Sequence, residues 1–102
     1  MNEKEDIKLA ASYESIRHAT RLTWIRMYLE HGYNNYITTR TQIFEAIKED
    51  NYNGFLSRYN ELKRAGAIQT KMFGKVTQRG VQGIHFQLVP PAKWTGKGRK
   101  KW

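Results

Sequence analysis

The chain has 102 residues, of which 39% are hydrophobic and 26% are charged, as expected for one small globular domain. Its formal net charge of +9 favours polyanions such as nucleic acids as partners. The absence of cysteine excludes disulfide bonds and thiolate metal sites. No apolar run is long enough to span a membrane, and the charged first residues do not resemble a signal peptide. We therefore expect a cytoplasmic protein.

The positive charge is unevenly distributed along the chain. Residues 1–11 carry a net charge of −1, and residues 90–102 carry +5 with no acidic residue. The first segment has only weak helical character, and the last segment is rich in glycine and lysine without an apolar stripe. We predict a flexible leader over residues 1–11, a folded domain over residues 12–90 and a disordered basic tail over residues 91–102.

A long first helix is predicted to begin between residues 12 and 15 and to end at residue 30 or 31, with Gly32 as its stop. Its apolar residues recur at helical spacing, so much of the helix is expected to face other elements. These residues are Leu22, Ile25 and Leu29, with Trp24, Met27 and Tyr28 broadening the apolar arc.

A second, shorter helix is predicted over residues 39–49, after a short β-prone segment at residues 36–38. Thr39 and Gln42 have the spacing of a capping box, in which each side chain accepts a backbone N–H of the other residue. The apolar residues that follow share one helical face, which supports the helix.

A third helix is predicted over residues 55–66, after a polar turn at residues 50–54. Phe55, Tyr59 and Leu62 form its apolar stripe. Gly66 lies where a left-handed residue ends a helix.

The chain then changes to the alternating pattern of strands, over residues 67–73 and residues 84–89. The connection at residues 74–83 contains three glycines and two basic residues, so we expect a long, mobile hairpin loop. Pro90 and Pro91 end the second strand because proline cannot donate to the ladder. The side chains expected to point inward are Ile68, Thr70 and Met72 in the first strand and Ile84, Phe86 and Leu88 in the second.

This order of elements resembles the winged helix-turn-helix superfamily over roughly residues 14–90. The segments that carry the resemblance are ITTRTQIFEAI, FLSRYNELKRAGAI and KVTQRGVQGIHFQLVP. The resemblance implies an α+β fold with three helices and a small antiparallel β-hairpin wing. Two features depart from the family pattern: Gln42 replaces the usual glutamate, and the turn EDNYNG is longer and more polar than usual.

The resemblance implies a protein that binds double-stranded DNA, with its third helix in the major groove and its wing on the backbone or in the minor groove. Such a protein would be nucleoid-associated, as a small transcriptional regulator or DNA-architecture factor of a microbe, phage or mobile element. The residues expected to contact DNA are Arg40, Asn51, Tyr52, Asn53, Ser57 and Arg58 in the helices, Lys71, Lys75, Gln78 and Arg79 in the wing, and Lys97, Arg99 and Lys100 in the tail.

Structural roles compete with DNA contact at several of these positions. The two asparagines also suit turns and helix caps, and Arg58 also suits an ion pair with Glu45 or Glu61. Trp94 and Trp102 suit stacking on unpaired bases, although Trp94 equally suits packing against the hairpin.

Other function classes remain open or are disfavoured by the sequence. The aromatic surplus suits a protein-binding adaptor or inhibitor, and the basic tail suits RNA binding. The first long helix suits a homodimer through Trp24, Met27 and Tyr28. The three histidines lie in three different elements, so we expect no metal site, and no arrangement of residues indicates a cofactor or an enzyme.

Overall fold

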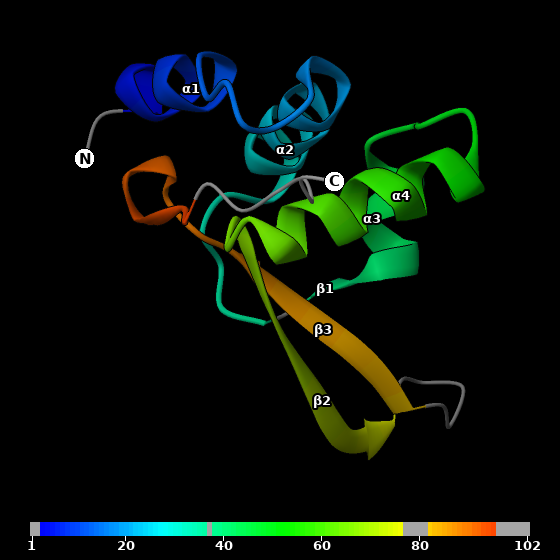
Figure 1. Cartoon of the computed structure of the whole chain (residues 1–102). Helices are drawn as coiled ribbons and strands as arrows, with labels where there is room; N and C mark the ends of the chain where they lie inside the picture. The colour runs from blue at the N-terminus through cyan, green and yellow to red at the C-terminus, as the bar shows by residue number, and fades with distance from the viewer. Residues whose placement is uncertain (1–2, 37, 77–81, 96–102) are drawn as a thin grey trace.

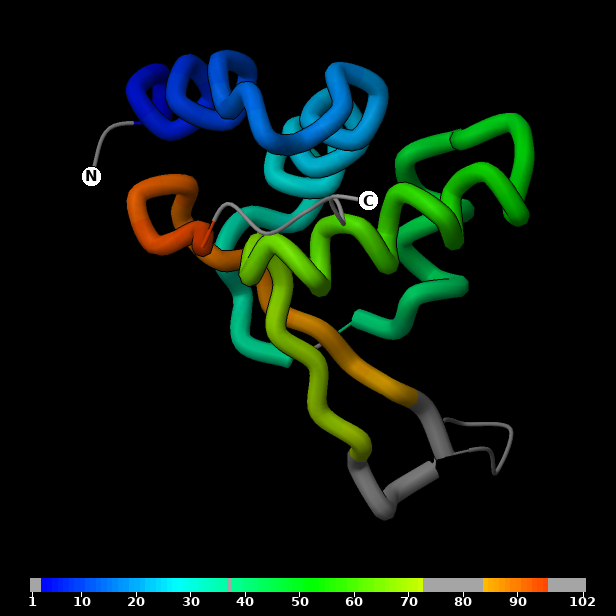
Figure 2. Tube along the Cα trace, in the orientation of Figure 1, coloured from blue at the N-terminus to red at the C-terminus, as the bar shows by residue number. Residues whose placement is uncertain are grey.

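The computed structural model describes residues 3–36, 38–76 and 82–95, with the backbone alone at residues 73–76 and 82–83. The described residues form four α-helices and a three-stranded antiparallel sheet, which confirms the predicted α+β class. The helices gather at one end, and a β-hairpin extends away from them (Figure 1, Figure 2). The elements are α1 (Glu3–Ala11), α2 (His18–His31), β1 (Thr38–Thr39), α3 (Arg40–Ala46), α4 (Tyr52–Arg64), β2 (Ile68–Val76), β3 (Gln82–Leu88) and the 3₁₀ turn η1 (Pro91–Lys93).

Helix α1 occupies the segment that the sequence predicted as a flexible leader, and it packs on α2. Acidic residues fill its first turn, where negative charge stabilises the helix dipole. Asp6 is buried and accepts a hydrogen bond of 2.7 Å from the Tyr33 hydroxyl. Burial and this bond raise the pKa of Tyr33 well above its ordinary value. The prediction differed because Tyr33 is distant in the sequence and gives α1 no local signal.

Helix α2 begins later than predicted because a distant side chain caps it. Arg17, the N-cap residue, makes no side-chain cap of its own. Its backbone N–H donates instead to Glu61 Oε2 in α4 over 3.1 Å. The carboxylate also complements the positive end of the α2 dipole. Gly32 ends the helix with a φ of 67°, in agreement with the sequence.

The buried face of α2 is not the predicted leucine stripe. Trp24 and Met27 are fully buried, whereas Leu22 and Leu29 are 37% and 62% exposed. The Trp24 indole nitrogen donates to the Ala67 carbonyl over 3.1 Å, so the largest side chain of the helix is both buried and hydrogen-bonded. Trp24 and Met27 are therefore in the core and not on a surface that a second copy could contact.

Side chains cap the N-termini of α3 and α4. The capping box at α3 is confirmed: Thr39 Oγ1 accepts the Gln42 N–H over 3.2 Å, and Gln42 Oε1 accepts the Thr39 N–H over 2.9 Å. At α4, Asn51 Oδ1 accepts the Gly54 N–H over 3.1 Å. This cap starts α4 earlier than predicted and places Gly54 inside its first turn.

Helix α4 ends at the glycine that the sequence indicated. Gly66 has a φ of 73°, and its N–H donates to the Lys63 carbonyl over 3.1 Å. The Ala67 N–H donates to the Leu62 carbonyl over 2.9 Å. These two bonds satisfy the last helical carbonyls and turn the chain directly into β2.

The sheet has the order β1-β3-β2, with β3 in the centre. Its inner face is buried at Ile68, Phe86 and Leu88, as predicted. Met72 and Ile84 were also predicted to point into the core, but they are 59% and 37% exposed. The prediction failed because the strands are longer than expected and extend past the helices (Figure 1). Strands β2 and β3 include part of the predicted loop, of which residues 77–81 lie outside the described part.

The described start of the predicted tail belongs to the core. Trp94 follows η1 and is buried, and its indole nitrogen donates to the Val89 carbonyl over 2.7 Å. Its ring lies edge-on to Trp24, with centroids 5.2 Å apart, and the Tyr13 hydroxyl donates to its carbonyl. Residues 91–95 are therefore ordered, and residues 96–102 lie outside the described part.

Candidate nucleic-acid interface

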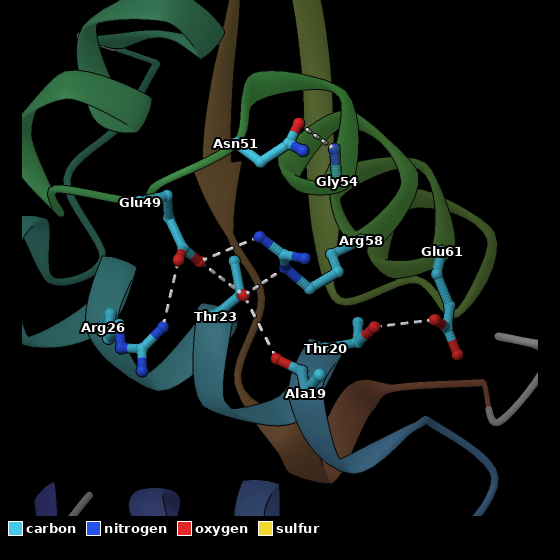
Figure 3. Close-up of polar contacts among 9 residues, drawn as sticks. All are labelled: Ala19, Thr20, Thr23, Arg26, Glu49, Asn51, Gly54, Arg58 and Glu61. Carbon is cyan, nitrogen blue, oxygen red and sulfur yellow. Dashed lines mark hydrogen bonds and ion pairs between the residues drawn. The ribbon is translucent and has the colours of Figure 1, made fainter.

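A buried ion pair joins α2 to α4. Glu61 is 1% exposed and accepts hydrogen bonds from Arg17 Nε over 2.6 Å and from the Thr20 hydroxyl over 2.7 Å. Figure 3 shows the bond to Thr20. Burial alone would raise the pKa of Glu61, but the hydrogen bonds from Thr20 and Arg17 outweigh it and hold that pKa below its ordinary value. Glu61 is therefore an ionised carboxylate inside the fold.

Glu49 forms a second such cluster between α2 and α4 (Figure 3). Its carboxylate lies 3.1 Å from Arg26 Nη1 and 3.4 Å from Arg58 Nη2, and it accepts the Thr23 hydroxyl over 2.8 Å. Arg58 also donates from Nε to Thr23 over 2.9 Å and is only 20% exposed. The structure thus gives Arg58 an internal ion pair, although with neither of the two glutamates that the sequence suggested.

Two of the predicted DNA contacts at the leading end of α4 have roles within the fold. Asn51 is the helix cap, and Tyr52 packs in an aromatic cluster with Phe44 and Phe55. Asp50, just before the cap, is exposed, so a negative charge lies at this end.

One face of α4 is exposed along its whole length. Asn53, Ser57, Asn60 and Arg64 recur at helical spacing and are all exposed, with Lys63 exposed beside them. Within Tyr52–Arg64, all of it described, the one acidic residue faces the interior. Asn53 and Ser57 were predicted DNA contacts. The helical spacing from Asn53 also places Asn60 and Arg64 on this face.

Arg40 differs from the paired arginines of α2 and α4. It opens α3, and its guanidinium carbon lies 5.9 Å from the centre of the Tyr59 ring. Among the described residues no carboxylate pairs with it. A cation at a helix N-terminus is unfavourable, so helix stability does not explain this arginine. Tyr59 is buried, and burial raises its pKa to about 12, so the ring beneath Arg40 is neutral.

Acidic residues are confined to one part of the sequence. Residues 1–61, the balanced region, contain eight lysines and arginines and nine acidic residues. Residues 62–102, the acid-free region, contain ten lysines and arginines and no acidic residue. The acid-free region includes the end of α4, the hairpin and the C-terminal segment. All of the net positive charge therefore lies on one side of a boundary at the end of α4.

The remaining predicted contacts lie in the acid-free region. Lys71 is exposed on β2, opposite His85 on β3. The Thr95 N–H donates to the Ala65 carbonyl over 2.8 Å, so the chain continues toward its C-terminus from beside the basic end of α4. The side chain of Lys75 and the residues Gln78, Arg79, Lys97, Arg99 and Lys100 lie outside the described part.

Neither a metal site nor a membrane span is found in the part of the chain that the structure describes. No three side chains of His, Asp or Glu gather there as metal ligands. No helix there is long and apolar enough to cross a membrane. A comparison with protein-family models, curated proteins and solved structures finds no match to this chain.

Proposed function

We propose that this chain is a double-stranded DNA-binding protein of the winged-helix type, acting as a small transcriptional regulator or DNA-architecture factor. The observation that carries the proposal is the separation of charge. In the balanced region, Glu61 and Glu49 pair with arginines of α2 and α4. The acid-free region has ten cations and no acidic side chain of its own. Such a surface attracts phosphate groups regardless of sequence.

The order of elements supports the winged-helix part of the proposal. Elements α2, β1, α3, α4, β2 and β3 follow the order helix, short strand, helix, helix and hairpin. In this arrangement α4 is the recognition helix and the hairpin is the wing. Helix α1 and the turn η1 are additions at the two ends of this unit.

The exposed face of α4 has the chemistry to read bases in a major groove. Asparagine can form two hydrogen bonds with adenine. Asn53 and Asn60 are separated by about 10 Å along the helix axis, which corresponds to about three base-pair steps. Lys63 and Arg64 supply phosphate contacts at the trailing end, and Arg40 supplies one from α3. Asn51 and Arg58 are not part of this proposal because each already has an internal partner.

Two observations count against the alternatives that the sequence left open. Several of the aromatic residues that suggested a protein-binding adaptor are engaged within the fold: Trp24 is buried, and the Tyr13 and Tyr33 hydroxyls donate to Trp94 and Asp6. Trp94, which the sequence also suggested for stacking on unpaired bases, is buried. DNA binding through the acid-free region requires neither exposed aromatic residues nor an exposed Trp94.

The test is a salt titration of duplex binding, measured by fluorescence anisotropy with a random-sequence duplex. The charge variant is Lys63→Gln with Arg64→Gln. The matched control is Lys8→Gln with Lys48→Gln, which removes two exposed cations from the balanced region. We expect the charge variant to bind more weakly and to reduce the slope of log affinity against log salt by about 1–2. The control should retain the slope of the unmodified protein.

Equal losses in the two variants would contradict the proposal, because the acid-free region would then have no special role. Absence of duplex binding at low salt would favour the adaptor function, and tighter binding to single-stranded RNA would favour the RNA function.

A further inference from the structure

The apolar row on the inner face of the sheet continues past the helices onto the outer part of the hairpin. Ile68 pairs with Leu88, and both are buried against the helices, as is Phe86. Thr70 lies opposite Phe86, and the pair beyond them on the same face is Met72 opposite Ile84. These two are exposed and are the outermost cross-strand pair whose side chains the structure describes.

The exposed pair is not explained by the stability of the isolated protein. Met72 and Ile84 are cross-strand neighbours, so each covers part of the other, yet both remain open to water. The opposite face of the same strands is polar, as expected for a solvated arm. Its side chains are Gln69 and Lys71 in β2 and His85 and Gln87 in β3. Single exposed apolar side chains are common, but this pair is contiguous and lies on an arm that extends past the helices, so it is a candidate contact surface for a partner.

The positive charge of the β2–β3 hairpin indicates which partner is complementary to the exposed pair. The hairpin lies wholly within the acid-free region, and Lys71 is exposed next to Met72. A second copy would bring an equally basic hairpin against it, and the two would repel. A polyanion with apolar surface between its charges is complementary, and duplex DNA has this character because stacked bases lie between two rows of phosphates.

We propose that Met72 and Ile84 form a wedge that enters the minor groove of duplex DNA, opens one base step and bends the duplex. This inference rests on the proposed function, because it assigns a role to the hairpin in the same complex. Apolar side chains inserted between base steps partly unstack them and bend the duplex away from the minor groove. Pyrimidine–purine steps such as TA open most readily, so the wedge selects these steps.

The experiment measures bending and unstacking of the same DNA with the full chain. A duplex of about 30 base pairs, shorter than the persistence length of DNA, carries a dye at each end and 2-aminopurine in a central TA step. Binding of the unmodified protein should bring the dyes closer and raise the 2-aminopurine fluorescence. The wedge variant, Met72→Thr with Ile84→Thr, places a β-branched, strand-compatible side chain at both positions but removes apolar surface. It should lose both signals and bind about tenfold more weakly.

Two further variants separate the wedge from charge and from folding. Met72→Leu with Ile84→Val keeps apolar side chains, so it should retain both signals. Lys71→Gln should weaken binding but leave the bend of the bound duplex unchanged. Circular dichroism melting should show that all variants are folded, since both wedge positions are exposed.

Duplex binding without a 2-aminopurine signal, or a wedge variant that bends DNA like the unmodified protein, would overturn the wedge and leave the proposed function intact. Absence of duplex binding would overturn both. Binding to vesicles with anionic lipid that the wedge variant loses, without any bending of DNA by the unmodified protein, would assign the pair to a membrane surface and overturn the wedge.

Discussion

The balanced region and the acid-free region use charge in opposite ways. In the balanced region, Glu61 and Glu49 lie between α2 and α4 and pair with Arg17, Arg26 and Arg58. The acid-free region contains no acidic side chain of its own. Charge therefore joins the helices of the first region, whereas the second region carries the excess of positive charge.

This difference changes how α4 should be understood. Arg58, which the sequence suggested as a DNA contact, attaches α4 to the rest of the fold through Thr23 and Glu49. The exposed basic residues of α4, Lys63 and Arg64, are at the other end of the helix, and Lys71 is exposed on β2. If the boundary between the two regions separates stability from binding, variants of the paired residues should change stability and variants of the acid-free region should change binding.

The largest effect is expected for Glu61→Gln. This change removes the negative charge and one of the two oxygens that accept from Arg17 and Thr20, so either the cap of α2 or the contacts to both side chains lose their acceptor. Breaking a fully buried ion pair costs about 3–5 kcal/mol. Because the Arg17 side chain is 44% exposed and therefore screened, we expect the free energy of unfolding to fall by about 2–3 kcal/mol. Urea unfolding followed by tryptophan fluorescence measures this change.

The control for this variant is Glu45→Gln, which makes the same change of charge at an exposed position of α3. It should alter the free energy of unfolding by less than about 0.5 kcal/mol. If the two variants lost similar amounts of unfolding free energy, Glu61 would act only through the net charge of the protein. Its ion pair with Arg17 would then not stabilise the packing of α2 on α4.

Arg58→Ala is expected to have the next largest effect, again on stability. Truncation leaves the Thr23 hydroxyl without a donor and Glu49 with only one arginine, so we expect a loss of about 1–2 kcal/mol. A double-mutant cycle with Glu49→Gln should show coupling between the two positions. If Arg58 instead reads a base, as the sequence suggested, Arg58→Ala would reduce discrimination between DNA sequences by about 1–3 kcal/mol with little loss of stability.

The features that the sequence predicted correctly are those whose cause is local. The capping box of Thr39 and Gln42, the glycine stop at Gly66 and the alternation around Phe86 each depend on residues a few positions apart. Helix α1 and the late start of α2 were not predictable in this way. Their anchors, Tyr33 and Glu61, come from other elements.

The candidate site shows the same limit. Asn53 and Ser57 were predicted as DNA contacts from their position near the start of the recognition helix, and both are exposed on α4. Arg58 could not be assigned from the sequence, because its pairing with Glu49 depends on how α4 crosses α2. The exposure of Met72 was unpredictable for a related reason: alternation shows which face a residue is on, but not whether a helix covers that part of the face.

A smaller effect, of opposite sign, is expected at Lys48, an exposed cation of the balanced region. Lys48 follows α3 with a φ of 57°, where a side chain is strained by about 1–2 kcal/mol. Lys48→Gly removes this strain but makes the unfolded chain more flexible, so we expect a net stabilisation of about 0.5 kcal/mol. Lys48→Ala is the control, because it removes the charge and keeps the strain. Thermal unfolding distinguishes them, and equal stabilisation by alanine would attribute the gain to charge.

The smallest effect is expected from His31, at the junction between the two regions. Its Nδ1 lies 3.2 Å from Thr38 Oγ1 of β1, its ring packs against Phe86 of β3, and its Nε2 is buried without a hydrogen-bond partner in the described part. Burial lowers the pKa of His31, and the nearby Glu30 only partly offsets this. The unfolded chain therefore binds a proton at higher pH than the folded chain does.

It follows that the contribution of His31 to stability is complete above pH 6.5, the ordinary pKa of the group, and declines as the pH falls through its folded value. Glu61 adds a second decline only below pH 4.5, because its pKa is lowered from that value. Urea unfolding at a series of pH values should show the first decline in the unmodified protein and not in His31→Gln, which cannot titrate. The free energy of unfolding of His31→Gln could instead show the same pH dependence between pH 6.5 and pH 4.5 as the unmodified protein. In that case the packing of α2 against the sheet does not depend on a neutral histidine, and the apolar contacts of Phe86 hold the junction.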